Sequence, residues 1–209
     1  MKKKKELKLF LPLIFLLFLS CTLKKQTPEL KNGDIIFQIS KSNQSKAIQI
    51  ATNSKYSHVG IIFKKNGKYY VYEAIRRVTY TPLSEWIKRG ENGEYVVKRL
   101  KNAKQILTPQ TLRKMKKEGK KFFGKPYDLY FEWSDDKLYC SELVWKIYKR
   151  SAGVEIGELR KLKDFNLSNK YVRKKLTERF GAKIPLNEPV ISPADLFNSP
   201  KLITVYKRD

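Results

Sequence analysis

The stretch most informative about the fold is residues 56–76, YSHVGIIFKKNGKYYVYEAIR. It contains two runs, 57–64 and 68–76, that are rich in β-branched and aromatic residues, as β-strands are. Between them lies Asn66-Gly67, a dipeptide that strongly favours a two-residue hairpin turn. The sequence therefore predicts an antiparallel β-hairpin here.

The register of this hairpin brings a histidine and a glutamate together. With Asn66-Gly67 at the centre of the turn, Gly60 lies opposite Glu73. His58 then lies opposite Ile75, and period-two alternation puts all four side chains on one face. His58 and Glu73 become diagonal neighbours, with about 7–8 Å between their backbones. Gly60, having no side chain, leaves room for the carboxylate.

Glu73 stands where a core-like strand would ordinarily carry an apolar residue. A carboxylate is costly to bury without a partner, and an imidazole N–H is a suitable one. His58 is the only histidine of the chain. The alternative interpretation is that this face of the hairpin is exposed to solvent.

Turn signals and hydrophobic periodicity outline the rest of the chain. The segment after Lys137 has apolar residues at the spacing of a buried helical face that starts at Cys140. Early and central strands without a regular strand–helix alternation predict an α+β fold with an antiparallel sheet. The other predicted strands are 34–40, 94–100 and 202–206, and the other predicted helices are 44–52, 82–88, 108–123, 170–180 and 192–195.

The composition limits the classes of function. A chain of 209 residues, 41% hydrophobic, has enough apolar residues for one well-buried core. The 45 Lys and Arg against 20 Asp and Glu give a formal charge of +25, but the basic residues are spread along the chain. No nucleic-acid-binding motif accompanies them, so no nucleic-acid partner is expected. One histidine and two cysteines argue against a disulfide framework or a zinc site, and no metal is expected.

The start of the chain resembles an export signal. Residues 1–20 have a basic start and an apolar run, and they end at Cys21 like a bacterial lipobox, in which the cysteine is lipidated. Residues 22–32 then read as a tether and 33–209 as the catalytic domain. The alternative is an uncleaved N-terminal anchor. Both interpretations predict a membrane-tethered protein of the bacterial cell envelope, with its domain outside the cytoplasm.

Cys140 is the thiol available for chemistry if Cys21 carries lipid. At the start of a helix, free N–H groups and the helix dipole favour a thiolate. Together with His58 and Glu73 it would supply a nucleophile, a base and a group that orients the base. The alternative is that Cys140 is a small buried hydrophobic residue.

Six segments together resemble the YiiX-like permuted papain-like enzymes of the NlpC superfamily. The resemblance implies a small antiparallel barrel-like sheet flanked by helices, with Cys140 as nucleophile, His58 as base and Glu73 as the third polar residue. In this family the histidine strand precedes the cysteine helix, as it does here. The segments are Asn32-Gly33-Asp34-Ile35-Ile36-Phe37, Tyr56-Ser57-His58-Val59-Gly60, Val71-Tyr72-Glu73-Ala74, Tyr127-Asp128-Leu129-Tyr130-Phe131-Glu132-Trp133, Tyr139-Cys140-Ser141-Glu142-Leu143-Val144 and Pro189-Val190-Ile191-Ser192-Pro193.

We therefore expect a thiol hydrolase that cleaves an amide bond in a cell-wall peptide or an N-acyl compound, without a metal or organic cofactor. The alternatives are an acyltransferase or thioesterase on lipids, and a ligand-binding lipoprotein that has lost turnover. Tyr56 and Tyr139 are candidates for the pocket or the oxyanion site, with the backbone N–H of Cys140 an equal candidate donor. Glu142 could face a substrate amino group or complement the helix N-terminus, and Asp34 could support the pocket or cap a turn.

Overall fold

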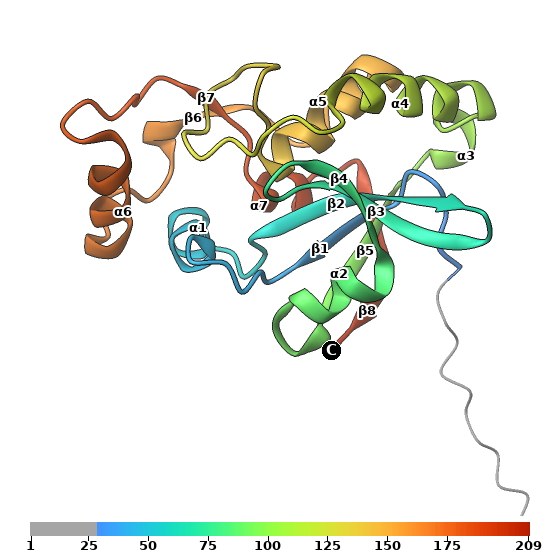
Figure 1. Cartoon of the computed structure of the whole chain (residues 1–209), viewed down its shortest axis with the longest axis horizontal. Helices are drawn as coiled ribbons and strands as arrows, with labels where there is room; N and C mark the ends of the chain where they lie inside the picture. The colour runs from blue at the N-terminus through green and yellow to red at the C-terminus, as the bar shows by residue number, and fades with distance from the viewer. Residues whose placement is uncertain (1–28) are drawn as a thin grey trace, which may run out of the picture.

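A computed structural model describes residues 29–209 of the chain (Figure 1). Its centre is an antiparallel six-stranded sheet in the order β4-β3-β2-β1-β5-β8, which with its flanking helices confirms the predicted α+β class. A two-stranded sheet pairs β6 with β7. The strands are β1 (Ile35–Gln38), β2 (His58–Lys65), β3 (Lys68–Ala74), β4 (Val78–Pro82), β5 (Tyr95–Leu100), β6 (Arg160–Lys161), β7 (Pro189–Val190) and β8 (Leu202–Arg208).

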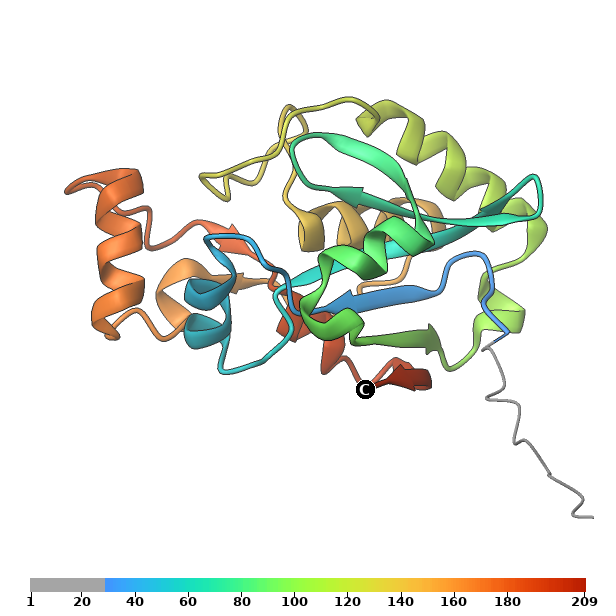
Figure 2. The same ribbon diagram turned by 60° about the horizontal axis from the view of Figure 1, so that its bottom comes forward.

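The helices are arranged around this sheet in three groups. Helix α5 packs on β2 and β3 with α4 against it, and α2 packs on β3 and β4. Helices α1 and α6 lie side by side at one end of the molecule (Figures 1 and 2). The helices are α1 (Ser45–Thr52), α2 (Leu83–Arg89), α3 (Ala103–Ile106), α4 (Pro109–Phe122), α5 (Cys140–Ala152), α6 (Lys170–Phe180) and α7 (Pro193–Phe197), with short 3-10 turns at Glu91–Gly93 and Leu162–Asp164.

The hairpin of β2 and β3 has the predicted register. Ile61 pairs with Tyr72 and Lys65 with Lys68, so the turn is Asn66-Gly67. Both turn residues have positive φ, 49° and 75°, as a type I′ turn requires. The register continues to Gly60 opposite Glu73.

Gly60 is required by the packing beside Glu73. A Cβ atom at Gly60 would lie 2.4 Å from Cγ1 of Val71 and 3.3 Å from Cβ of Glu73. The first distance is too short for any real contact, so the absence of a side chain at position 60 makes room for the residues opposite.

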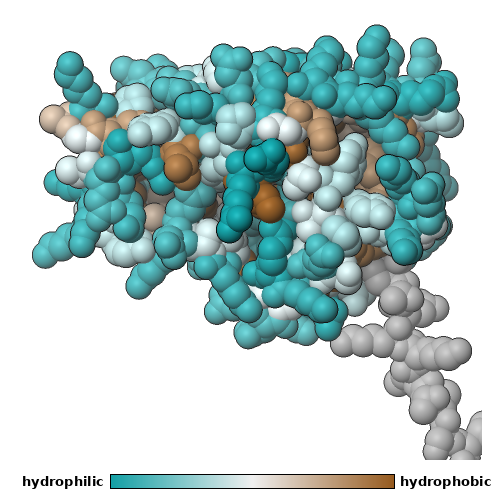
Figure 3. Space-filling view, in the orientation of Figure 1, coloured by the Kyte–Doolittle hydropathy of each residue, from teal (hydrophilic) through white to brown (hydrophobic). Residues whose placement is uncertain are grey.

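The core divides between the two faces of the sheet. On one face α5 buries Leu143, Val144, Ile147 and Tyr148 completely, which confirms the apolar face predicted for this helix. On the other face Trp86 of α2 is fully buried in a second, smaller cluster. The surface shown in Figure 3 is mostly hydrophilic, with small hydrophobic areas between.

Strand β4 was not expected from the sequence. It is an edge strand that pairs with β3, placing Thr79 opposite Glu73, and it ends at Pro82. Proline has no N–H to donate in the hydrogen-bond ladder of a sheet. For this reason the sequence predicts that Pro82 starts a helix, and it gives no signal for the strand before it.

The described part of the fold begins before Gly33. Leu30, in the segment predicted as a tether, is buried in the cluster around Trp86, and the Asn32 side chain accepts a hydrogen bond from the Lys64 N–H at 2.6 Å. The predicted signal segment 1–20 and Cys21 lie outside the described residues. None of the helices between residues 29 and 209 is both long enough and apolar enough to cross a membrane.

Candidate active site

His58 and Glu73 meet across the hairpin. Nε2 of His58 lies 2.5 Å from Oε2 of Glu73, in a site where His58 is 7% exposed and Glu73 is completely buried. An ionised carboxylate only accepts hydrogen bonds, so Nε2 is the donor. This fixes the ring and leaves Nδ1 available for a second partner.

Two further donors hold the other carboxylate oxygen of Glu73. Thr81 of β4 donates its hydroxyl to Oε1 at 2.5 Å, and Arg89 at the end of α2 donates to the same atom. Burial on its own would raise the pKa of Glu73, but hydrogen bonds and positive charge from His58, Arg89 and Thr81 lower it below its usual value. Glu73 therefore stays ionised although it is buried.

Cys140 is the first residue of α5, with Tyr139 at the N-cap position. Its thiol is free and only 3% exposed. Burial opposes protonation of His58, but hydrogen bonds and charges from Cys140 and Glu73 outweigh it and raise the pKa of His58 to about 9. The imidazole therefore holds a proton at neutral pH beside the sulfur.

Tyr127 is a polar neighbour of Cys140 that the sequence analysis did not single out. Its hydroxyl accepts a hydrogen bond from Nε2 of Gln44 at 2.8 Å. Burial, and secondly the charge of Cys140, raise the pKa of Tyr127 well above its ordinary value. The hydroxyl therefore keeps its proton and can donate it to an oxygen that carries negative charge beside Cys140.

Tyr127 reaches the site through backbone pairing over a loop. It forms an isolated parallel bridge with Leu138, two residues before Cys140. In the sequence, Tyr127 appears only as one residue of a segment shared with the family. Nothing in that segment indicates that its backbone pairs with Leu138.

Two unlike cavities meet at this site. A cleft of about 1060 Å³ is lined by His58, and a smaller cavity of about 100 Å³ is lined by Cys140. Residues that line both are Gln44, Tyr127, Lys175 and Arg179. The imidazole therefore faces the cleft and the thiol faces the small cavity.

The two tyrosines proposed from the sequence occupy different places. Tyr139 lines the small cavity, and its hydroxyl accepts a hydrogen bond from the Ile191 N–H at 3.2 Å. That bond holds the segment after β7 against the start of α5. Tyr56 lines neither cavity and stacks on Phe197, with 4.1 Å between the ring centroids.

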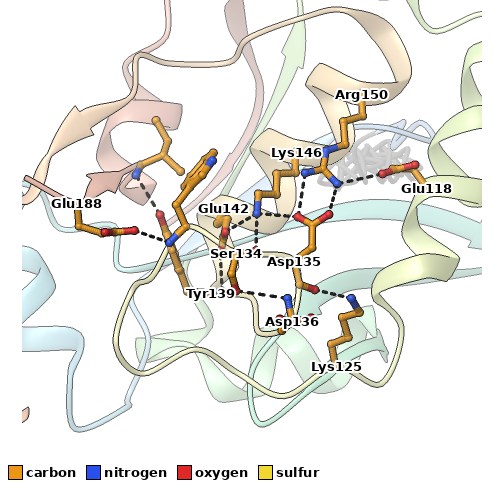
Figure 4. A network of polar contacts seen from close by, with 12 residues as sticks. Glu118, Lys125, Ser134, Asp135, Asp136, Tyr139, Glu142, Lys146, Arg150 and Glu188 are labelled. Carbon is orange, nitrogen blue, oxygen red and sulfur yellow. Dashed lines mark hydrogen bonds and ion pairs between the residues drawn. The ribbon is translucent and has the colours of Figure 1, made fainter.

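Glu142 faces an amino group of its own chain. The carboxylate is completely buried and forms an ion pair with Nζ of Lys146 at 2.7 Å (Figure 4). Lys146 also contacts Oδ1 of Asp135 at 2.9 Å, and Arg150 holds the same aspartate. Burial raises the pKa of Glu142 to about 8, and Lys146 limits that rise. The network ties α5 to the loop that precedes Cys140.

Asp34 is buried and forms an ion pair with the partly exposed Arg99, away from both cavities. Its Oδ1 accepts from Nε of Arg99 at 2.6 Å and its Oδ2 from Nη2 at 2.7 Å. The same carboxylate accepts from the Lys31 N–H at 2.7 Å. It connects β1, β5 and the segment before them.

A cysteine at the start of a helix, beside a histidine and a carboxylate on an antiparallel sheet that precedes it in the chain, defines a permuted papain-like hydrolase site. The chain belongs to the permuted papain-like amidase family (YaeF/YiiX, C92), whose model matches residues 29–206. It is therefore a cysteine hydrolase of that family.

Two relatives from Escherichia coli are close in sequence. The strain K12 protein called "Uncharacterized protein YiiX" is 51% identical over 177 residues, which cover 85% of this chain and 86% of that protein. A crystal structure described as metalloprotein YiiX, from strain O157:H7, has a TM-score of 0.81 and 52% identity. The match covers 85% of this chain and 97% of that one. Between residues 29 and 209 of the present chain, no three or more His, Cys, Asp or Glu side chains are grouped so that they could hold a metal ion.

Proposed function

We propose that the protein hydrolyses an amide bond, with Cys140 as nucleophile, His58 as acid and base, and Glu73 as the residue that orients His58. The observation that carries this proposal is the 2.5 Å contact of His58 with Glu73, on a ring whose pKa is raised to about 9 by Cys140 and Glu73. The contact with Glu73 holds the His58 ring, and the proton on it, beside the sulfur of Cys140.

The reaction has two halves. The Cys140 thiolate forms a bond to the carbonyl carbon, the C–N bond breaks, and His58 gives its proton to the leaving amine. A water molecule then attacks the thioester while His58 takes one of its protons. The carboxylic acid leaves, and the thiolate–imidazolium pair is restored.

Two hydrogen-bond donors can stabilise the negative charge that develops on the carbonyl oxygen. One is the backbone N–H of Cys140, which has no helical partner in the first turn of α5. The other is the Tyr127 hydroxyl, held by Gln44. Two such donors stabilise a tetrahedral intermediate more than they stabilise the planar amide.

The proposal includes attachment to a membrane of the bacterial envelope through Cys21. It rests on the charge and hydropathy of residues 1–20 and on Ser20 before the cysteine. In a bacterial host, replacing Cys21 with Ala should abolish labelling by a fatty-acid precursor and leave the unprocessed form. Unchanged labelling would rule out lipidation at this residue.

The catalytic part is tested by incubating the full-length protein with a fractionated envelope extract and identifying the bond broken by mass spectrometry. The Cys140→Ala variant is the control. In water enriched in heavy oxygen, the released acid should carry the label, because water resolves the thioester. An acyl group moved to another molecule without label would indicate an acyltransferase, and no Cys140-dependent product would indicate a binding protein.

A further inference from the structure

Helix α4 has one buried face and one basic face. Met115 and Phe122 are buried in the main core. Because an α-helix turns by about 100° per residue, the opposite face collects six exposed basic side chains in an arc of about 160°. We call this arc the basic face of α4, and its side chains belong to Arg113, Lys114, Lys116, Lys117, Lys120 and Lys121.

The positive charge of the basic face is hardly neutralised by the protein itself. Glu118 is the only carboxylate residue of α4, and it pairs with Lys121 at 2.6 Å and with Arg150 of α5 at 3.4 Å. The other five basic residues of the face form no ion pair with any residue between 29 and 209. The face therefore suits an anionic partner, and at an anionic membrane each lysine or arginine strengthens binding about fivefold.

An exposed aromatic residue follows the basic face directly. Phe123, the C-cap residue of α4, is 58% exposed. Its ring lies against that of Tyr80 on the edge strand β4, with 6.2 Å between the centroids, and Tyr80 is exposed as well. Binding at a membrane interface increases with the apolar area buried there and with attraction to anionic lipids. The end of α4 offers the first and its basic face offers the second.

The chain enters the described fold beside the start of α4. A Cβ atom at Gly33 would lie 2.8 Å from Cδ1 of Leu107 and 3.6 Å from Cδ2 of Leu112. Gly33 follows Cys21 by 12 residues, and a chain of that length spans at most about 40–43 Å. Helix α4 has 14 residues and is about 21 Å long, so an anchor at Cys21 keeps the whole helix within reach of the membrane surface.

This closeness favours a lipid surface over a soluble polyanion as the partner. A tethered surface is present at a high effective concentration, so even weak attraction is sufficient to hold the helix against it. Among the described residues that line the active-site cleft or the small cavity, none belongs to α4. The basic face and the active site are thus different surfaces of the molecule.

We infer that the basic face of α4, together with Phe123, is a docking surface for a membrane that contains anionic lipids. The inference rests on the proposed membrane attachment and adds the surface that lies on the membrane. An anchor alone would leave the catalytic domain free to turn, whereas the docked helix fixes one orientation.

Contact of Phe123 with lipid is tested by photo-crosslinking on the full-length protein in vesicles. The photoreactive amino acid p-benzoylphenylalanine is placed at position 123, or at position 186 as a control, because Leu186 is also exposed. In vesicles of phosphatidylcholine and phosphatidylglycerol, position 123 should crosslink to lipid at least about fivefold more than position 186. Omitting phosphatidylglycerol, or raising the salt concentration, should remove most of that excess.

The role of charge is tested with a matched pair of double variants. Lys114→Gln with Lys117→Gln should lower crosslinking at position 123 at least about tenfold. Arg173→Gln with Lys174→Gln removes the same charge from exposed positions of α6, which lies at the other end of the molecule (Figures 1 and 2). This second pair should leave the crosslinking yield unchanged.

Flotation of the same samples separates docking from anchoring. Protein that floats with both kinds of vesicle but crosslinks equally at positions 123 and 186, or regardless of phosphatidylglycerol, would overturn the docking surface and leave the anchor in place. Protein that floats with neither kind would overturn both. Salt-sensitive binding of a soluble polyphosphate through Lys114 and Lys117, without any crosslink to lipid, would assign the basic face to a polymer and overturn docking on a membrane.

Discussion

Nε2 of His58 and Oε2 of Glu73 are 2.5 Å apart across a hairpin whose register places Gly60 opposite Glu73. Because Thr81 and Arg89 occupy the second oxygen of the carboxylate, Glu73 has one oxygen directed at His58. The contact orients the imidazole, and with Cys140 it raises the pKa of the ring to about 9. The pH dependence of activity should therefore report on this contact.

Replacing Glu73 with Gln should lower activity and move its alkaline limit. A carboxylate that favours imidazolium raises the pKa of His58, so its removal lowers that pKa and His58 loses its proton at lower pH. In pH profiles of kcat/KM, the fall that begins near about pH 9 in the unaltered protein should begin at lower pH. The maximum should drop by about one to three powers of ten.

Glu85→Gln is the matched control, because Glu85 is an exposed glutamate of α2. It should leave both the maximum and the alkaline limit in place. An unchanged alkaline limit in Glu73→Gln would show that Glu73 does not hold the proton on His58.

Replacing Tyr127 with Phe removes the hydroxyl that faces the site and keeps the ring. We expect kcat to fall about hundredfold with little change in KM, since an oxyanion donor acts mainly in the transition state. Steady-state kinetics on an identified substrate measures both. Tyr80→Phe, which changes an exposed tyrosine outside both cavities, should have no effect. A rise in KM at constant kcat would assign Tyr127 to ground-state binding.

Lys146→Met should destabilise the protein more as the pH rises. Burial raises the folded pKa of Glu142 to about 8, above its value in the unfolded chain. The folded protein therefore becomes less stable as the pH rises from the unfolded pKa to the folded pKa of this group. Without Lys146 the folded pKa rises further and the loss grows. Urea unfolding should show a larger difference from the unaltered protein at about pH 9.5, above the folded pKa of Glu142 in the unaltered protein, than at about pH 5.

Adding Glu142→Gln to Lys146→Met should remove most of this pH dependence, because the buried carboxylate is then absent. Equal destabilisation of the single variant at the two pH values would mean that Glu142 is not the group left without a partner.

Asp34 should matter for stability and not for the thiol. Its carboxylate is buried but Arg99 is partly exposed, so loss of this ion pair and of the hydrogen bond from the Lys31 N–H costs about 1–3 kcal/mol. Asp34→Ala should lower the free energy of unfolding by about that amount. Under folding conditions, the alkylation rate of Cys140 should stay the same. A slower alkylation by the folded variant would connect Asp34 to the site after all.

The sequence predicts best what depends on local pattern. The register of the hairpin follows from Asn66-Gly67, and period-two alternation then places His58 near Glu73 without any knowledge of the rest of the fold. The buried face of α5 follows in the same way from the spacing of its apolar residues.

The residues that the sequence did not reveal depend on tertiary contacts. Thr81 contacts Glu73 because β4 pairs with β3. Tyr127 lies near Cys140 because its backbone pairs with that of Leu138, two residues before the cysteine. Closeness in sequence to His58 suggested Tyr56, but Tyr56 lies before the start of β2, and its ring packs on Phe197. For Glu142, the amino group that the carboxylate faces belongs to Lys146, at spacing i, i+4 on the same helix, and not to a substrate.

The most direct test of the central claim is the alkylation rate of Cys140 by iodoacetamide as a function of pH, in the full-length protein with and without His58→Ala. The thiolate–imidazolium pair predicts that Cys140 reacts faster than glutathione at about pH 6, where free thiols are almost entirely protonated. His58→Ala should slow that reaction at least about tenfold at the same pH. If the folded protein reacts no faster than glutathione at about pH 6, or if His58→Ala reacts as the unaltered protein does, then Cys140 and His58 do not form the catalytic pair.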